Sequence, residues 1–134
     1  MRILIAEDDL TSRKFLLKYF SKYGEVDVVI DGLEALDAYA LSMKDKRPYN
    51  LICLDVMMPK VDGIKVLKAI RDYEKQHKIL AENKAKIIMI TALADTQYVN
   101  DAFGMGCEAY IPKPVDLKNL KTVMTKLNIL VKEN

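Results

Sequence analysis

The stretch Leu51-Ile-Cys-Leu-Asp55-Val-Met-Met-Pro-Lys-Val-Asp-Gly63 decides the fold of this chain. It begins with four apolar residues, continues with the carboxylate of Asp55, and then contains the turn formers Pro59 and Gly63. A short apolar run that ends in turn signals is typical of a strand buried on both faces, as in a parallel sheet. The carboxyl end of such a strand lies at the ligand crevice of an open α/β sheet. Asp55 is therefore the first candidate functional residue.

An acidic cluster follows a second apolar run near the amino terminus. Ile3-Leu4-Ile5-Ala6 predicts another buried strand, and Glu7, Asp8 and Asp9 follow it directly. Because the carboxyl ends of parallel strands meet at one edge of a sheet, two acidic strand ends predict a pocket that binds a cation. Asp9 has a simpler role, since a carboxylate before a helix caps its first turn. We expect Asp62, in the opening stretch, to be a turn residue and not a ligand.

The bulk composition fits one small domain. The 134 residues can bury well over half of the surface of the unfolded chain, and the formal net charge is only +2. No long basic block is present, which argues against nucleic acid as a direct partner. Cys53 and Cys107 are 54 positions apart and form neither a metal-binding pair nor a disulfide framework. The first apolar run is too short for a signal peptide or a membrane span. We expect a cytoplasmic single domain over residues 1–134, without an output domain.

Strand and helix patterns alternate five times along the chain. Apolar or alternating runs predict strands at residues 2–6, 26–30, 51–54, 87–90 and 109–111. Amphipathic stretches predict helices at 11–23, from 32 to about 43, from 63 onward, at 95–103, and from 116 nearly to the end. Strands that alternate with helices pair in parallel, because each helix makes a right-handed crossover between two strands.

The connection before the fourth expected strand, residues 72–84, is unusually long. Glu74 and Lys78 stand four positions apart in the order that stabilises a helix, which indicates that the third helix continues past Arg71. We expect a solvated helix extension here and not a dedicated partner site.

Four motifs in this chain resemble those of the receiver domain of two-component response regulators. They are Glu7-Asp8, Asp55 with Met-Pro and Asp-Gly after it, Thr91-Ala92, and Lys113-Pro114. The motifs fall in the family's order at the ends of the first, third, fourth and fifth expected strands, and the match covers essentially the whole chain. The resemblance implies a flavodoxin-like, doubly wound sheet of five parallel strands in the order 2-1-3-4-5, with five helices.

The resemblance also implies a divalent metal site. Asp8, Asp55 and the backbone carbonyl of Met57 would be direct ligands of Mg²⁺ or Mn²⁺, and Glu7 would act through a water molecule. Such oxygen ligands suit a hard cation that keeps part of its hydration shell. Like charges about 4 Å apart repel by about 4 kcal/mol at an effective dielectric constant of about 20, so the acidic cluster itself favours binding a cation.

In this family the aspartate after the third strand takes a phosphoryl group from a phosphohistidine, a role that falls on Asp55. Lys113 would place a positive charge at the phosphoryl oxygens, and the Thr91 hydroxyl would donate a hydrogen bond to them. Such a transfer depends mainly on positioning and charge neutralisation. The resemblance therefore implies a phosphorylation-activated switch whose partner is a sensor histidine kinase or a histidine phosphotransfer protein. It would be no enzyme beyond catalysing its own phosphorylation and dephosphorylation.

The resemblance further implies how the signal reaches the surface. Tyr110 corresponds to the family's switch aromatic, which turns inward when Thr91 moves towards the phosphoryl group. Both residues compete for the small space beside the fourth helix, so phosphorylation shifts the population of two arrangements. The surface expected to change runs from about residue 95 to 126, over the fourth helix, the fifth strand and the fifth helix. A downstream protein would bind there, without direct nucleic-acid binding or membrane insertion.

Two apolar residues are expected to make the phosphorylated state long-lived. Met57 and Leu93 stand two residues after Asp55 and Thr91, at the positions that flank the attacking water in the family. Neither side chain can hold this water by a hydrogen bond or accept its proton. We therefore expect slow self-dephosphorylation.

Three other functions remain open at this point. A receiver domain can also be an intermediate phosphate carrier in a multistep phosphorelay. A phosphatase that forms an aspartyl phosphate needs an acid/base carboxylate two residues after its nucleophile, where this chain has Met57. A flavin-binding electron carrier of similar topology needs a phosphate-cradling loop after the first strand, where Glu7, Asp8 and Asp9 would repel phosphate.

Overall fold

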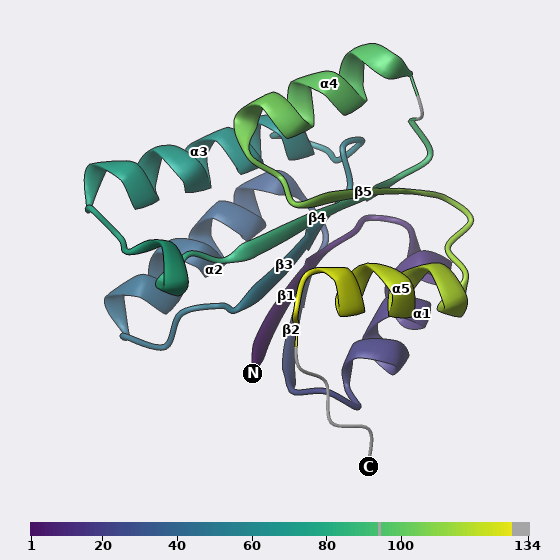
Figure 1. The fold of residues 1–134 in the computed structure, drawn as a ribbon, viewed down its shortest axis with the longest axis horizontal. Coiled ribbons are helices and arrows are strands. Elements are labelled where there is room, and N and C mark those ends of the chain that lie inside the picture. The colour runs from purple at the N-terminus through teal and green to yellow at the C-terminus, as the bar shows by residue number, and fades with distance from the viewer. Residues whose placement is uncertain (94, 130–134) are drawn as a thin grey trace.

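The fold is a parallel sheet of five strands between two layers of helices (Figure 1). The computed structural model describes residues 1–93 and 95–129. All neighbouring strands pair in parallel, in the spatial order β2-β1-β3-β4-β5. This order confirms the predicted flavodoxin-like, doubly wound sheet. The strands are β1 (Arg2–Ala6), β2 (Glu25–Val29), β3 (Leu51–Leu54), β4 (Lys86–Thr91) and β5 (Ala109–Pro112).

The described part of the chain has five α-helices, four between successive strands and one after the last strand. They are α1 (Leu10–Phe20), α2 (Gly32–Lys44), α3 (Gly63–Gln76), α4 (Thr96–Met105) and α5 (Leu117–Lys126), and a short 3-10 helix, η1 (Ala81–Asn83), precedes β4. Helices α2, α3 and α4 lie on one face of the sheet, and α1 and α5 lie on the other (Figure 1). Within residues 1–93 and 95–129, no helix has both the length and the apolar character that crossing a bilayer requires.

Each strand supplies side chains to both cores, because successive side chains of a strand point to opposite faces of the sheet. In β1, Leu4 and Ala6 pack in the core beneath α2 and α3, whereas Ile3 and Ile5 pack in the core beneath α1 and α5. All four residues of β3 are buried. Burial on both faces explains why these strands are continuous apolar runs in the sequence.

Aspartate side chains cap four of the helices. In each case the carboxylate accepts a hydrogen bond from the backbone N–H three residues later, which satisfies a donor of the first helical turn. Asp9 caps α1 as predicted. Asp62, predicted as a turn residue, is more specifically the N-cap of α3 and accepts from the N–H of Lys65. The other two caps are Asp31 and Asp116.

Two predicted helix ends are wrong. Helix α1 ends at Phe20 instead of residue 23, and the chain then forms a turn in which the N–H of Tyr23 donates to the carbonyl of Phe20. Helix α5 ends at Lys126, and Asn128 has a φ of 54°, a left-handed conformation that a helix cannot contain. Residues 130–134 of the predicted last helix lie outside the described residues. The other predicted ends lie within two residues of those observed.

Helix α3 continues past Arg71 to Gln76, as predicted, but its last turn is not simply solvated. Glu74 is only 1% exposed and accepts hydrogen bonds from Arg71 and from the N–H of Ala85. Lys78 has a φ of 53° and lies beyond the helix. The predicted pairing of Glu74 with Lys78 is therefore wrong, because Glu74 points inward and binds the segment that leads into β4.

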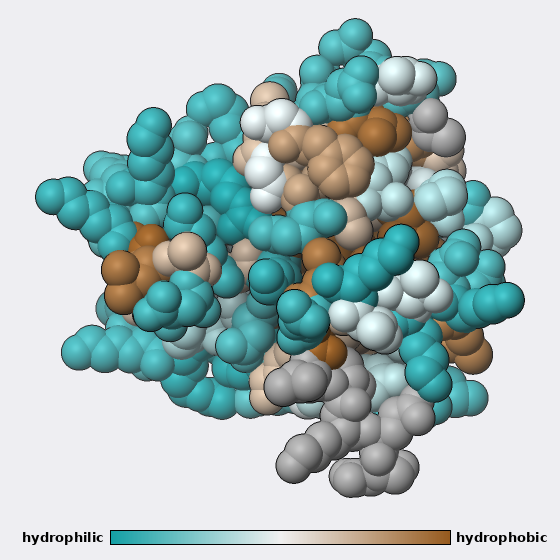
Figure 2. Space-filling model, in the orientation of Figure 1, coloured by the Kyte–Doolittle hydropathy of each residue, from teal (hydrophilic) through white to brown (hydrophobic). Residues whose placement is uncertain are grey.

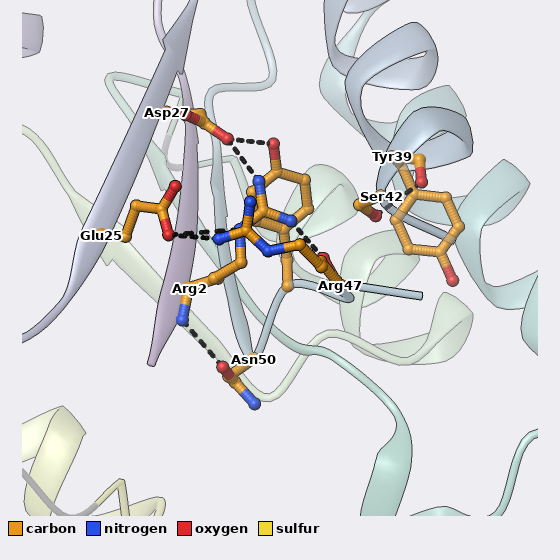
Figure 3. Close-up of polar contacts among 8 residues, drawn as sticks. Arg2, Glu25, Asp27, Tyr39, Ser42, Arg47 and Asn50 are labelled. Carbon is orange, nitrogen blue, oxygen red and sulfur yellow. Dashed lines mark hydrogen bonds and ion pairs between the residues drawn. The ribbon is translucent and has the colours of Figure 1, made fainter. Parts of the chain in front are cut away.

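A polar network closes the amino-terminal end of the sheet (Figure 3). The Arg2 guanidinium donates to Asp27 at 2.8 Å and lies 4.5 Å from the ring centre of Tyr49, and the Tyr49 hydroxyl donates to the same carboxylate at 2.6 Å. The backbone N–H of Arg2 donates to the Asn50 side chain at 2.8 Å. Burial, together with the bond to Asp27, raises the pKa of Tyr49 to about 12. The network joins β1 to β2 and to the segment before β3. It lies at the end of the sheet opposite Glu7, Asp8 and Asp55.

Candidate functional site

The predicted site residues converge at the carboxyl end of the sheet. Backbone hydrogen bonds extend the strand pairing by one residue and so fix the backbone of three site residues. The N–H of Glu7 donates to the carbonyl of Val29, that of Asp55 to Ala6, and that of Lys113 to Thr91. Since β1, β3, β4 and β5 are neighbours in this order, residues from four strand ends meet at one edge. The fold therefore brings together side chains that lie more than a hundred positions apart in sequence.

Gly63 brings the first turn of α3 against the backbone of Asp55. A Cβ atom at this position would lie 2.1 Å from the carbonyl oxygen of Asp55 and 2.7 Å from its carbonyl carbon. The N–H of Gly63 donates to the carbonyl of Val56 at 2.9 Å. Only glycine permits this close approach, which fixes the loop that carries Asp55.

Lys113 places a positively charged side chain in the site. Its Nζ lies 2.7 Å from Oδ2 of Asp55 and forms a second ion pair with Oε1 of Glu7. Burial alone would lower the pKa of Lys113, but the hydrogen bonds and charges of the two carboxylates outweigh burial and raise it. Lys113 is therefore a fixed positive charge between the ends of β1 and β3.

The two buried carboxylates differ in ionisation. Burial raises the pKa of Glu7 to about 7; the bond from Lys113 opposes the shift, and the contact with Asp55 adds to it. Burial also acts to raise the pKa of Asp55, which is only 5% exposed, but hydrogen bonds from Lys113, Glu7, Thr91 and the N–H of Met57 outweigh it and lower this pKa. Asp55 is therefore the ionised carboxylate at neutral pH.

Glu7, Asp8 and Asp55 can together hold a divalent cation. One carboxylate oxygen from each lies within 4.8 Å of those of the others. Oε1 of Glu7 is buried and, apart from its ion pair with Lys113, accepts no hydrogen bond from the described residues. An acidic oxygen set of this kind suits Mg²⁺ or Mn²⁺. Met57 adjoins the set, since its N–H donates to Oδ1 of Asp55 at 3.0 Å.

Thr91 and Tyr110 both contact the backbone of Leu93. The Thr91 hydroxyl is fully buried and accepts a hydrogen bond from the N–H of Leu93 at 3.3 Å. The Tyr110 hydroxyl donates to the carbonyl of the same residue. Leu93 is thus held by the two residues that the sequence predicted as the switch pair.

A groove of about 760 Å³ opens beside the acidic residues, between the β3–α3 loop and α4. Met57 and Leu93 both line it, together with Asp8. Met57 is 57% exposed, and Leu93 is partly buried. The two residues expected to control water access therefore border one open space next to Asp55.

Sequence reasoning missed one residue that organises the site. Arg13 of α1 donates from Nη1 to the backbone carbonyls of Glu7 at 3.1 Å and of Asp8 at 3.3 Å, which holds the acidic loop. An arginine in an amphipathic helix carries no sign of this role in the sequence, because its side chain could equally lie in solvent.

Comparison with known proteins identifies a family for this architecture. A family model described as the response regulator receiver domain matches residues 3–125. The chemotaxis protein CheY of Treponema pallidum is 30% identical over 122 residues, which cover 89% of this chain and 76% of that protein. The osmosensing histidine protein kinase SLN1 of Saccharomyces cerevisiae is 29% identical over 128 residues, which cover 94% of this chain and 10% of SLN1.

A solved structure agrees in both fold and sequence. A chain in the crystal structure of the CheX-CheY-BeF3-Mg²⁺ complex from Borrelia burgdorferi is 32% identical, with a TM-score of 0.79 and coverage of 95% of this chain and 89% of that one. Curated relatives can be much longer than the matched region. The chain spans 10% of the length of SLN1 and 55% of that of ycf29, a probable transcriptional regulator of Porphyra purpurea.

Proposed function

This chain belongs to the response regulator receiver domain family, the phosphorylation-activated switch of two-component systems, and we propose that Asp55 is its phosphoryl acceptor. The observation that carries the proposal is the contact of Lys113 Nζ with Asp55 Oδ2 at 2.7 Å, beside two further carboxylates. The lowered pKa of Asp55 leaves it ionised at neutral pH, as a nucleophile must be.

The proposed transfer uses groups that surround Asp55. An oxygen of Asp55 attacks the phosphorus of a phosphohistidine, the O–P bond forms as the N–P bond breaks, and the leaving imidazole nitrogen takes up a proton. Lys113 offsets charge on the phosphoryl oxygens, and the Thr91 hydroxyl can turn to donate a hydrogen bond to one of them. Phosphoryl transfer requires mainly such positioning and charge neutralisation. The chain acts here on itself, and we propose no turnover of a separate substrate.

We propose Mg²⁺, or Mn²⁺ in its place, as the cation of this site. Asp8, Asp55 and the carbonyl of Met57 would hold it directly, and Glu7 through water. When bound, the cation supplies positive charge to the phosphoryl oxygens. The spacing of the three carboxylates and the burial of Glu7 Oε1 beside Asp55 support this assignment. So does the related Borrelia burgdorferi complex, which contains Mg²⁺ and BeF3, a chemical analogue of a phosphoryl group.

We propose that Thr91 and Tyr110 transmit phosphorylation to the surface of α4, β5 and α5. When the Thr91 hydroxyl turns to the phosphoryl group, it gives up its long hydrogen bond with Leu93, and Tyr110 moves with the same loop. Helix α4 is suited to a protein partner, because two of its large apolar side chains, Tyr98 and Phe103, are 38% and 49% exposed. Figure 2 shows hydrophobic surface over α4 within an otherwise largely hydrophilic face.

The proposed phosphoryl donor is a sensor histidine kinase or a histidine phosphotransfer protein, and a downstream protein binds the α4–β5–α5 surface. We also propose that the chain acts in the cytoplasm.

Intact mass measurement after treatment with acetyl phosphate and Mg²⁺ tests the acceptor. We expect the wild type to gain one phosphoryl group, the gain to disappear in Asp55→Asn, and a chelator to suppress it. Asp62→Asn is the matched control, because Asp62 lines the neighbouring groove and asparagine still caps a helix. Phosphorylation that persists in Asp55→Asn would exclude Asp55 as the acceptor.

A further inference from the structure

Arg71 of α3 holds the carboxyl-terminal end of α4. Its Nε donates to the carbonyl of Gly106 at 3.0 Å, and its Nη2 donates to both carboxylate oxygens of Glu108 at 2.9 Å each. The Arg71 side chain is only 16% exposed. Charge-assisted bonds with little access to water are among the stronger contacts of a protein, so this end of α4 is firmly tied to α3.

The same guanidinium is also anchored to the start of β4. Its Nη1 donates to Glu74 at 2.6 Å and to the carbonyl of Ala85 at 2.9 Å. Both carboxylates are in turn bound by backbone: Glu74 accepts from the N–H of Ala85 at 2.9 Å, and Glu108 accepts from the N–H of Ile87 at 2.6 Å. Arg71 therefore joins α4 to two elements that are themselves part of the core.

The two ends of α4 are held very differently. At the carboxyl end, Gly106 adopts a left-handed φ of 101°, its N–H donates to Phe103 at 3.1 Å, and the N–H of Cys107 donates to Ala102 at 3.1 Å. At the amino end, Asp95 makes no side-chain capping bond with any described residue, unlike the caps of the other four helices. The first turn of α4 is therefore the weaker end.

The phosphorylation site reaches α4 from this weaker end. Leu93 lies two residues before Asp95, and its N–H and carbonyl are bound by Thr91 and Tyr110. A rearrangement of Thr91 therefore moves the chain just before the first turn of α4. The last turn is separated from that movement by the length of the helix and by the contacts of Arg71.

We propose that Arg71 is a positioning residue of the switch, which fixes the carboxyl end of α4 so that phosphorylation pivots the helix about Gly106. The inference rests on the function proposed above and adds which part of the output surface moves and which residue limits the movement. The surface over the first half of α4 changes, whereas the α4–β5 connection stays in place.

Amide hydrogen exchange with and without acetyl phosphate tests the pivot, with intact mass recorded on the same samples. In the wild type we expect phosphorylation to change exchange by about fivefold or more at residues 96–100, and by less than about twofold at 102–107. In Arg71→Lys, which keeps the charge but loses most of the hydrogen bonds, the change spreads to 102–107. Lys68→Met is the matched control, because Lys68 pairs with Asp72 on the exposed face of α3. In this variant the change in exchange should stay confined to residues 96–100.

The possible results separate the two proposals. A wild type that gains no phosphoryl group would overturn the proposed function and the pivot with it. A phosphorylated wild type with equal changes in amide exchange at both ends of α4 would overturn the pivot alone. This comparison uses only the wild type, so it does not depend on whether the variants fold. A confined change that remains confined in Arg71→Lys would overturn the role of Arg71.

Discussion

Glu7 and Asp55 share the ammonium of Lys113, yet only one of them is fully ionised near neutral pH. The pKa of Glu7 is raised by burial from 4.5 to about 7, so without a cation this residue binds a proton up to neutral pH. Protonation of Glu7 therefore favours the folded, metal-free protein below about pH 4.5, and this contribution is lost as the pH rises through about 7. A bound cation favours the opposite, ionised form.

Magnesium affinity should consequently rise with pH. Because the proton on Glu7 must leave, we expect the dissociation constant for Mg²⁺ to be about tenfold higher at pH 6 than at pH 8. Calorimetric titration at the two pH values measures this difference. Glu7→Gln cannot titrate and should bind weakly with little dependence on pH. Equal wild-type affinities at pH 6 and pH 8 would show that Glu7 carries no such proton.

We expect Met57 and Leu93 to set the lifetime of the phosphorylated state. Both side chains border the groove beside Asp55, and neither can orient a water molecule or accept its proton. The double variant Met57→Asn with Leu93→Glu supplies those polar groups, and we expect its phosphoryl group to decay roughly a hundredfold faster. The decay is followed by intact mass after removal of the donor. A wild-type decay as fast as that of the double variant would refute this explanation.

At the scale of elements, strands were easier to predict from the sequence than helix ends. The buried strands are apolar on both faces, so their runs in the sequence coincide with the observed β3 and nearly with β4. Helix ends depend on single residues such as Asn128, whose left-handed backbone ends α5: asparagine is a weaker helix-stop signal than glycine, and the apolar residues after it continue the helical pattern. Glu74 was misjudged for a different reason: its partners Arg71 and Ala85 become neighbours only after folding.

The N-cap of α3 stabilises this helix through its side chain. Asp62→Ala removes the acceptor for the N–H of Lys65, and we expect it to lower the free energy of unfolding by about 1 kcal/mol. Urea denaturation measures the loss, and Asp62→Asn should retain most of the wild-type stability. A loss of the same size in Asp62→Asn would mean that charge, and not the cap, stabilises α3.

For the molecule as a whole, the sequence was sufficient to predict which residues form the site. It was not sufficient to predict the long-range contacts that hold the surrounding elements in place. Parallel strand order forces Asp8, Asp55, Thr91 and Lys113 to one edge, because each lies within two residues of the end of a recognisable strand. The contacts of Arg71 reach 35 and 37 positions along the chain, between residues that no local pattern links. Long charged side chains can lie in solvent or fold inward, and only the assembled core decides between these possibilities.

Lys113 should couple the site to the distant surface. Lys113→Ala removes the ammonium that binds Asp55, and we expect it to allow some phosphorylation while the exchange change across 95–126 falls to near zero. The measurement is amide exchange at matched levels of phosphorylation. A variant that shows the wild-type exchange change would mean that Lys113 has no coupling role.

Reductive trapping determines whether Asp55 carries the phosphoryl group. Borohydride converts an aspartyl phosphate to homoserine, so peptide mass spectrometry of the phosphorylated and reduced protein locates the acceptor. We expect homoserine at residue 55, only after treatment with the donor and Mg²⁺. Homoserine at residue 8 or 62, or no reduced residue in a protein that has gained the phosphoryl mass, would contradict it.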